Sequence, residues 1–467
     1  MSYGRLKIHT DTNVITSENV VHEVNKAYAT HCLNQADVQM LWDYYRGKTK
    51  ILSKKKEVRE DINHLVNENR AYEIVSFHKG YVFGEPIQYV RRENTTSKEN
   101  DDKLAQDINA LNGFMSDANK ATCDNTLAEW MYVAGVGYRL TLPNKRWYAG
   151  GDEPPFEMYA LDPRRTFVVY SSDIDEHPVM AVYCSEREHG GKVFSVYTAN
   201  DYFSFEEGGN VVWESHTMGM IPIIEYPADN AHLGVFEIVI SLLDALDELQ
   251  SNRMDDVVQF VNSFLGIFGG ELDEDTYKKL NDWKTLCLPE GTDAKYLSDK
   301  LSQSDIQTLK DDLHQSILTI CGVPNRNGGS STSDTGSAVV LRDGWQDAEA
   351  RAKATEAIFK SSENQSLRVV LRILRDTEGT GLRLTDITPH FTRRNYENIA
   401  SKSQVLIAML NNPKIHPEVA YASCGMFADP ESAYLQGMTY YEEQIAKWEP
   451  VEVNEDEGED DDVSVSG

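Results

Sequence analysis

The first third of the chain is mostly helical in the spacing of its apolar residues. Apolar positions recur three and four apart across residues 22–52, which predicts a helix there. The stretch 69–90 begins with the same spacing and ends in "YVFGEPIQYV", whose Gly-Glu-Pro suits a turn before a short strand. A polar stretch, 91–103, is expected to be an exposed loop, and helical spacing resumes over 104–137.

Short β-branched and aromatic segments, separated by polar turns, occupy residues 138–229. Examples are "PFEMYALDP", "TFVVYSS", "VMAVYCSE" and "VFSVYTAN". Segments of this kind are typical of strands, so this region is predicted to be a mostly antiparallel sheet.

Two helices are predicted around a compact insert in the middle of the chain. Residues 236–261 contain no Gly or Pro and carry apolar residues three and four apart, which predicts a helix of about 39 Å. Residues 262–300 look like a strand, a short helix and a second strand. The second long helix then runs to residue 321, with Ser304 as its N-cap and Gly322-Val323-Pro324 as its stop.

The segment that follows, 325–340, reads "NRNGGSSTSDTGSAVV" and is small, polar and rich in glycine. It fits three interpretations: a phosphate-binding loop, a linker between domains, or a mobile loop that each subunit contributes to a shared channel. A helix of about 58 Å is predicted next, over 338–376, where Gly344 is the one glycine. Residues 382–450 are predicted to form several short helices around a small core, and the acidic end, 453–467, is expected to be disordered.

The motifs of common enzyme classes are missing from the sequence. A P-loop requires GxxxxGK[ST] after a strand, whereas here no lysine follows Gly336 and a helix precedes the loop. No HExxH, GxSxG or paired Cys/His cluster occurs. We therefore expect no enzyme, and we assign no catalytic, cofactor-binding or metal-binding residues.

Composition narrows the class of protein. The 467 residues predict roughly two to four domains. With 75 acidic and 45 basic residues the formal charge is −30, which argues against coating a nucleic acid but not against lying near one and repelling it. The first residues have no apolar core of the kind that a secretory signal needs, so we expect none. The apolar clusters are too short, or too interrupted by acids, to span a membrane. The six cysteines lack CxxC spacing, so we expect reduced, mostly buried thiols in a soluble intracellular protein.

The strongest basic run, "RGKTKILSKKKEVR", spans residues 46–59. It would suit contact with a nucleic acid or an acidic partner. A solvated helix or loop is the favoured interpretation, because no aromatic residues interleave with the charges to stack on bases.

Acidic residues mark the faces of the two predicted helices that we expect to be exposed. Plain solvation explains them, but packing of the helices side by side in a ring would also cover the apolar stripes and turn an acidic face to the lumen. The acidic residues in question are Asp244, Asp247, Glu248, Asp255, Asp256, Asp311 and Asp312.

The order of these segments resembles the portal proteins of tailed bacteriophages, in the siphophage-type branch. "YYRGKTKIL" and "NRAYEIVSFHKGYVFGEPIQY" are similar to the N-terminal signature of that family, and "YALDPRRTFVVYSSDIDEHPVMAVYC" to its wing sheet. "FEIVISLLDALDELQSNRMDDVVQFVNSFLGIFGG" resembles the first stem helix running into the clip. "TGSAVVLRDGW" stands where the family begins its long helix, and the resemblance covers residues 30–445.

The resemblance implies an α+β portal fold that assembles into a ring of twelve subunits. It has a mixed wing, a helical stem, a small α/β clip, a long helix and an α-helical crown. Carried onto this sequence, the segments are 1–29 N-terminal arm, 30–235 wing, 236–262 and 303–321 stem helices, 263–302 clip, 322–336 tunnel loop, 337–376 long helix, 377–446 crown and 447–467 disordered acidic tail.

The function implied is a DNA channel at one capsid vertex, through which the viral genome is packaged and ejected. The expected partners are the terminase large subunit, the major capsid protein, the scaffolding protein, the head-tail adaptor protein and double-stranded DNA, with no membrane. The expected location is the virion, with assembly in the host cytoplasm. The alternative is a non-conducting structural adaptor or scaffold ring.

Two groups of residues would serve this channel. A flexible, glycine-rich loop could follow moving DNA, and an acidic stem lumen would keep phosphates from sticking. The loop candidates are Asn325, Arg326, Asn327, Gly328, Gly329, Ser330, Ser331, Thr332 and Gly336. The lumen candidates are Asp247, Glu248, Asp255, Asp256, Asp311 and Asp312.

Overall fold

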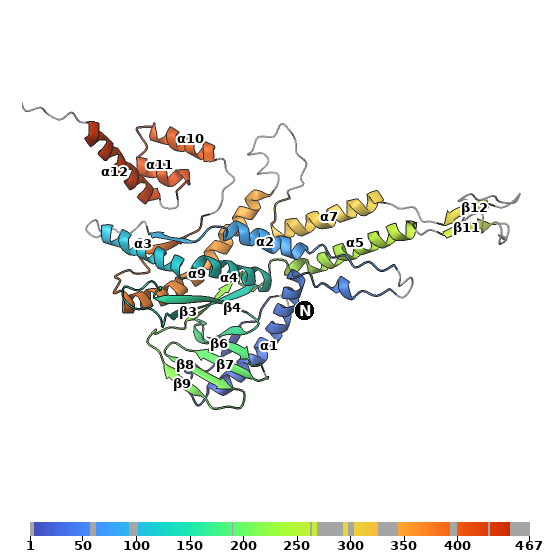
Figure 1. Cartoon of the computed structure of the whole chain (residues 1–467), viewed down its shortest axis with the longest axis horizontal. Helices are drawn as coiled ribbons and strands as arrows, with labels where there is room; N and C mark the ends of the chain where they lie inside the picture. Colours follow the sequence, from blue (N-terminus) through green and yellow to red (C-terminus); the bar gives the residue numbers. More distant parts are fainter. Residues whose placement is uncertain are drawn as a thin grey trace, which may run out of the picture. The chain divides into compact units, whose positions relative to one another are not determined.

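The protein is described here by a computed structural model, in which a run of strands between residues 136 and 227 separates two mostly helical parts of the chain (Figure 1). The mixed content confirms the expected α+β class. The chain divides into two compact units, Met1–Arg393 and Arg394–Gly467. The described residues are 4–56, 62–92, 101–188, 190–261, 264–268, 293–297, 303–325, 344–392, 399–427 and 430–448.

The helices of the first unit lie close to the predicted positions. Each of the expected helical stretches before residue 137 contains a helix, and the pair in the middle of the chain is present. The helices are α1 (Val20–Tyr45), η1 (Lys50–Ser53), α2 (Arg70–Val82), α3 (Asp101–Asp117), α4 (Lys120–Ala134), η3 (Glu237–Val239), α5 (Ile240–Val261), α7 (Gln303–Cys321) and α9 (Trp345–Thr377).

The strands of the first unit confirm the mostly antiparallel sheet. One six-stranded sheet has the order β1-β5-β6-β7-β8-β9, in which the β1–β5 pair is parallel and the other pairs are antiparallel. Its strands are β1 (Ile8–Thr10), β5 (Thr166–Ser171), β6 (Pro178–Glu186), β7 (Lys192–Tyr197), β8 (Asp201–Glu206) and β9 (Val212–Ser215).

Three smaller sheets complete this unit. The sheet β10-β3-β4 combines β3 (Val136–Pro143), β4 (Phe156–Leu161) and β10 (Ile223–Pro227). The pair β13-β2 joins Ile387–His390 to Gln88–Arg91, so the chain after α9 returns to the early part of the unit. The pair β11-β12 joins Phe264–Phe268 to Asp293–Leu297 and provides both strands of the predicted insert; the helix expected between them lies outside the described residues.

Both faces of the six-stranded sheet are covered. On one face α1 packs Val20, Val24 and Ala27 against apolar strand residues such as Phe167 and Val182. On the other face the β10-β3-β4 sheet contributes a second cluster, which includes Tyr138 and Ile223. Apolar residues of β5 and β6 are therefore buried on both sides of the sheet.

A buried group of charges ties α9 to the sheets. Arg139 of β3 bonds to Asp124 of α4 and, at 2.7 Å, to Glu363 of α9, and the side chain of Arg139 is fully buried. Lys120 also contacts both carboxylates, so two cations balance two anions. Burial alone would raise the pKa of Glu363, but the charges of Arg139 and Lys120 outweigh it and hold that pKa well below its usual value. The hydroxyl of Tyr226 donates to Glu363 as well, over 2.9 Å.

Two helix starts differ from the predicted ones. The long helix was expected to begin at Ala338 and pass through Gly344, yet α9 begins at Trp345. Gly344 has a φ of +82° and caps the helix, a left-handed conformation that breaks α-helical continuity and suits glycine; residues 338–343 lie outside the described part. Ser304 was expected as the N-cap of α7 but lies inside the helix, where its carbonyl accepts from Thr308.

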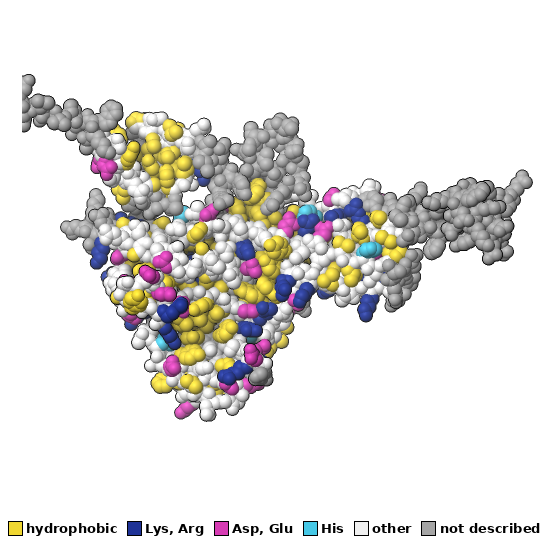
Figure 2. All heavy atoms as spheres, in the orientation of Figure 1, with side chains coloured by type: hydrophobic (Ala, Val, Ile, Leu, Met, Phe, Trp, Pro, Cys, Tyr) yellow, Lys and Arg dark blue, Asp and Glu magenta, His cyan; other side chains and the backbone are white. Residues whose placement is uncertain are grey.

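The second unit contains α10 (Ile399–Leu410), α11 (Pro417–Cys424) and α12 (Pro430–Trp448). Its buried core consists of Leu406, Ala420 and Cys424, which confirms the prediction of short helices around a small core. Residues 377–393, expected with this region, lie in the first unit instead, because β13 pairs with β2. Hydrophobic side chains are prominent on the face of this unit drawn in Figure 2, and exposed examples are Val405, Ile407, Val419, Leu435 and Tyr440.

Candidate functional site

The candidate site is the helix pair α5 and α7, which run side by side toward β11 and β12 (Figure 1). One end of the pair is held by an apolar core. Leu243 and Leu246 of α5 are buried there together with Ile317 and Leu318 of α7. Each such side chain contributes about 1.5–3 kcal/mol when fully buried, so this end of the pair is firmly anchored.

A segment from an early part of the chain lies along α5. We call it the strap and define it by two arms, an outgoing arm of residues 49–56 and a return arm of residues 62–68. Two side-chain amides close its base beside α1 and α2. The side chain of Asn67 donates to the carbonyl of Gly47 over 2.7 Å, and the side chain of Asn69 donates to the carbonyl of Tyr45 over 3.1 Å. The strap is therefore rooted in the helices of the first unit and reaches onto α5.

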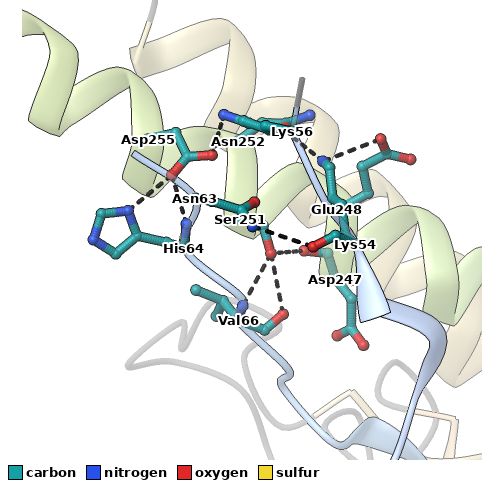
Figure 3. Close-up of polar contacts among 10 residues, drawn as sticks. All are labelled: Lys54, Lys56, Asn63, His64, Val66, Asp247, Glu248, Ser251, Asn252 and Asp255. Atoms are coloured by element: carbon teal, nitrogen blue, oxygen red, sulfur yellow. Dashed lines mark hydrogen bonds and ion pairs between the residues drawn. The ribbon is translucent and has the colours of Figure 1, made fainter. Parts of the chain in front are cut away.

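The return arm docks its backbone on one face of α5. The backbone N–H of His64 donates to Asp255 over 2.8 Å, that of Val66 to the hydroxyl of Ser251 over 3.0 Å, and that of Glu68 to Asp247 over 3.1 Å. Figure 3 shows the first two of these contacts. Alternate residues of an extended chain are spaced by about 6.6 Å, and every fourth residue of a helix by about 6.0 Å. The two spacings match closely enough for three backbone N–H groups, at every second residue of the return arm, to find acceptors at every fourth residue of the helix.

The outgoing arm uses lysine side chains instead of backbone. Lys50 pairs with Asp244 at 2.8 Å, Lys54 donates to Asn252 at 2.9 Å and contacts Glu248 at 3.4 Å, and Lys56 pairs with Asp255. The two arms meet where the amide of Asn63 donates to the carbonyl of Lys54 over 3.1 Å (Figure 3). Positive side chains therefore follow the acidic face of α5 through three helical turns.

Glu68, at the end of the return arm, connects three helices. Its carboxylate bonds to Lys310 of α7 at 2.6 Å, to Arg70 of α2 at 2.8 Å and to Gln250 of α5. Burial alone would raise the pKa of Glu68, but the hydrogen bonds from Lys310 and Arg70 lower it below its usual value. One carboxylate thus helps to fix α5 and α7 relative to each other.

The predicted lumen acids separate into two groups. Asp247 is 4% exposed and Asp255 is 1% exposed, so the expectation that they mark an exposed face is wrong. Both are covered by the strap: Asp247 accepts from Thr49 and Glu68, and Asp255 from Lys56 and His64. The other four lumen candidates, Glu248, Asp256, Asp311 and Asp312, are exposed as expected. Asp244, which was predicted to mark an exposed face but not the lumen, is partly buried.

The two buried acids have opposite pKa shifts. Burial raises the pKa of Asp247 despite the bonds it accepts from Glu68 and Thr49. At Asp255, burial again acts to raise the pKa, but bonds from Lys56 and His64 prevail and lower it. Asp255 is therefore held as a carboxylate by the strap, whereas Asp247 relies on neutral donors.

The structure also corrects the interpretation of the basic run. A solvated segment was favoured, but the side chains of Lys54 and Lys56 are only 23% exposed, and both contact α5. The run serves an acidic partner within the same chain, while residues 57–61 lie outside the described part. The sequence carried no local signal of this contact, because the lysines and their acidic partners lie 194 to 199 positions apart in the chain.

The end of α7 leads toward the predicted tunnel loop. Gly322 has a φ of +69° and ends the helix, as expected. A cavity of about 330 Å³ lies here, lined by residues that include Arg70, Lys310, His314 and Asn325. Of the predicted loop residues, Asn325 is described, and Arg326, Asn327, Gly328, Gly329, Ser330, Ser331, Thr332 and Gly336 lie outside the described residues.

One other group has ligand-type side chains. Asp173, Asp175 and His177 place potential metal-ligating atoms within 4.8 Å of one another, and all three are exposed. Asp173 already accepts hydrogen bonds from Asn13 and Ser171, and His177 contacts Asp175. These contacts occupy part of the ligand capacity, and the group lies in the β5–β6 connection, away from the helix pair in sequence.

The cysteines and the apolar stretches of the helices bear on two further expectations. Cys123, Cys184, Cys321 and Cys424 are buried and Cys32 is exposed, which confirms that most of these thiols are buried. Among the described helices, none has an apolar stretch of the length that a membrane crossing requires.

Comparison with known proteins gives one family match. A family model described as "Phage portal protein, SPP1 Gp6-like" matches residues 28–457. A chain from the "Neck of native GTA particle computed with C12 symmetry" is 12% identical with a TM-score of 0.44, over 84% of this chain and 94% of that one. A chain from the "Virion of native gene transfer agent (GTA) particle" is 11% identical with a TM-score of 0.45, and the match covers 84% of this chain and 94% of that one. No curated protein matches.

Proposed function

Because the chain belongs to the SPP1 Gp6-like family of phage portal proteins, we propose that twelve copies form a ring that conducts DNA at one vertex of a capsid. The match over residues 28–457 carries this proposal, because it includes every described strand from β2 onward, the helix pair and α9. The genome would pass through this ring during both packaging and ejection.

Surface chemistry of the helix pair supports a ring. Large apolar side chains stay exposed on both helices, namely Met254 on α5 and Leu309 and Ile320 on α7. A neighbouring subunit would cover them, since heterologous contacts of one surface with a different one generate closed rings. Asp311 and Asp312, exposed on α7, would then be available to the lumen, where negative charge prevents DNA phosphates from adhering.

The partners follow from the position at a capsid vertex. We propose contacts with the major capsid protein and the scaffolding protein during assembly, with the terminase large subunit during packaging, and with a head-tail adaptor protein afterwards. The site of action is the virion, and assembly takes place in the host cytoplasm. The ring itself is not an enzyme, since the energy for translocation comes from the terminase.

Residues 325–336 are proposed to form the tunnel loop that touches the passing DNA. Replacing them by a rigid linker of the same length is expected to leave ring assembly intact and to abolish DNA packaging in a reconstituted system. A replacement by a shuffled sequence of the same composition is the control, because it preserves loop freedom. Normal packaging by the rigid variant would contradict a tunnel role and favour a non-conducting adaptor ring.

An ATPase assay of the purified chain separates this proposal from an enzymatic one. We expect no turnover above a blank without protein. Robust hydrolysis by the pure ring would contradict the assignment.

A further inference from the structure

Two kinds of contact hold α5 along its length. Up to Leu246 the helix is held by the apolar core that it shares with α7 and α2. Beyond Leu246, the side chains of α5 that contact the strap are polar: Asp247, Glu248, Ser251, Asn252 and Asp255. Most strap contacts therefore lie beyond the apolar core, where Arg253 of α5 also donates to Gln307 of α7 over 2.9 Å.

The strap brings little apolar surface to this contact. Among its described residues only Ile51 and Ile62 are buried apolar side chains, and Leu52 and Leu65 are exposed. When the strap separates from α5, the lysines, the carboxylates and the three amides of the return arm gain hydrogen bonds to water. Contacts of this composition open locally at a lower free energy than an apolar core.

We propose that the strap is a polar latch, which releases the part of α5 beyond Leu246 while the apolar end of the helix pair stays anchored. The latch opens as a unit because both arms meet at the Asn63–Lys54 contact and share Asp255, which Lys56 and His64 both contact. In a portal ring, release would let the far part of the helix pair adjust to DNA in the channel. That use rests on the proposed function, whereas the latch itself does not.

Ionic strength acts directly on the outgoing arm. Its ion pairs join Lys50 to Asp244, Lys54 to Glu248 and Lys56 to Asp255, and the side chains of Lys50 and Glu248 are 71% and 61% exposed. Salt shortens the screening length from about 10 Å at 0.1 M to about 3 Å at 1 M, so it weakens the exposed pairs most. The closed state of the latch is therefore favoured at low salt.

Amide hydrogen exchange of the full-length protein, resolved to single residues by mass spectrometry, tests the latch. The reporters are the amides of His64, Val66 and Glu68, and the amides of the central strand β6 are the reference. We compare the parent chain with Lys56→Gln, and with Lys55→Gln as the matched control, because Lys55 is the exposed neighbour.

We expect the three reporter amides to show one common protection factor, lower than that of β6 and about tenfold lower in Lys56→Gln, the effect of losing one charge-assisted bond. Lys55→Gln should leave the rates unchanged. If Lys56→Gln does not fold, the parent chain at about 0.05 M and 1 M salt gives the same information, with faster strap exchange expected at high salt.

Strap amides that exchange as slowly as β6, and respond to neither the variant nor salt, would overturn the latch. Equal acceleration by Lys55→Gln would do so as well, because the effect would then be one of overall charge. The test is independent of ring formation: a chain that forms no ring contradicts the proposed function but still reports on the strap.

Discussion

His78 of α2 donates a hydrogen bond from its Nε2 atom to the carbonyl oxygen of Cys321, the last residue of α7, over 2.8 Å. A carbonyl can only accept, so this nitrogen carries the proton. Arg351 of α9 donates to the preceding carbonyl, that of Ile320, over 2.9 Å. Carbonyls that the end of a helix leaves unpaired are thus satisfied by two other helices, which fixes the point where the chain enters the predicted loop.

The environment of His78 predicts a pH-dependent stability. Burial lowers the pKa of His78 to about 4, and the nearby charge of Arg351 acts in the same direction. Since this pKa lies below the value of about 6.5 in an unfolded chain, the folded state favours the neutral ring. The stabilisation is complete above pH 6.5 and is lost as the pH falls toward 4, by on the order of 3 kcal/mol in total. His31, whose pKa burial also lowers to about 4, adds to this loss.

Chemical denaturation at several pH values between 7 and 4.5 checks this prediction, at a fixed protein concentration. His78→Gln keeps an amide donor without a titrating group, so its free energy of unfolding should fall less steeply with pH than that of the parent. Parallel curves for the two proteins would show that His78 does not titrate as described.

We predict that replacing Glu68 lowers the stability of the protein more than replacing an ordinary surface acid does. Glu68→Gln removes the charge that Lys310 and Arg70 contact, and we expect the free energy of unfolding to fall by about 1–3 kcal/mol. Glu248→Gln is the matched control on the neighbouring helix, where the exposed carboxylate contributes less than about 1 kcal/mol. Equal losses in the two variants would argue against a joining role for Glu68.

We predict that Arg139 and Glu363, which belong to one buried group of charges, are strongly coupled in their effects on the free energy of unfolding. Glu363→Gln leaves Arg139 and Lys120 with one carboxylate between them, and a buried pair broken in this way costs about 3–5 kcal/mol. The double variant Arg139→Met/Glu363→Leu should lose less than the sum of its two single variants. Additive losses, measured by urea denaturation, would mean that the two residues act independently.

The helices and strands could be predicted because the spacing of apolar residues that indicates them is a local feature of the sequence. The run 236–261 without Gly or Pro became α5 with its short η3 start, and β-branched segments became the strands of the sheets. Gly344 shows the limit of this reasoning: one glycine is tolerated in many helices, and only its left-handed backbone conformation made it a boundary here.

The expectation of an exposed face was wrong at Asp247 and Asp255 for a different reason. Asp255 and the backbone N–H of His64 are 191 positions apart in the chain, so no local pattern reveals that the strap covers the acidic face. The charge pattern correctly marked a polar face of α5. Whether that face contacts water, a channel lumen or another part of the same chain depends on the tertiary fold. The family match supports a portal role without assigning any one acid to the lumen.

The most direct test of the central claim is native mass spectrometry of the purified chain, combined with end-on electron-microscope images of the same sample. We predict one dominant species of about twelve subunits, seen as closed rings with a central hole; twelve is the number that the family resemblance implies. A monomer or dimer at concentrations well above those of assembly would contradict it, because the exposed apolar residues of α5 and α7 would then have no ring neighbour to cover them.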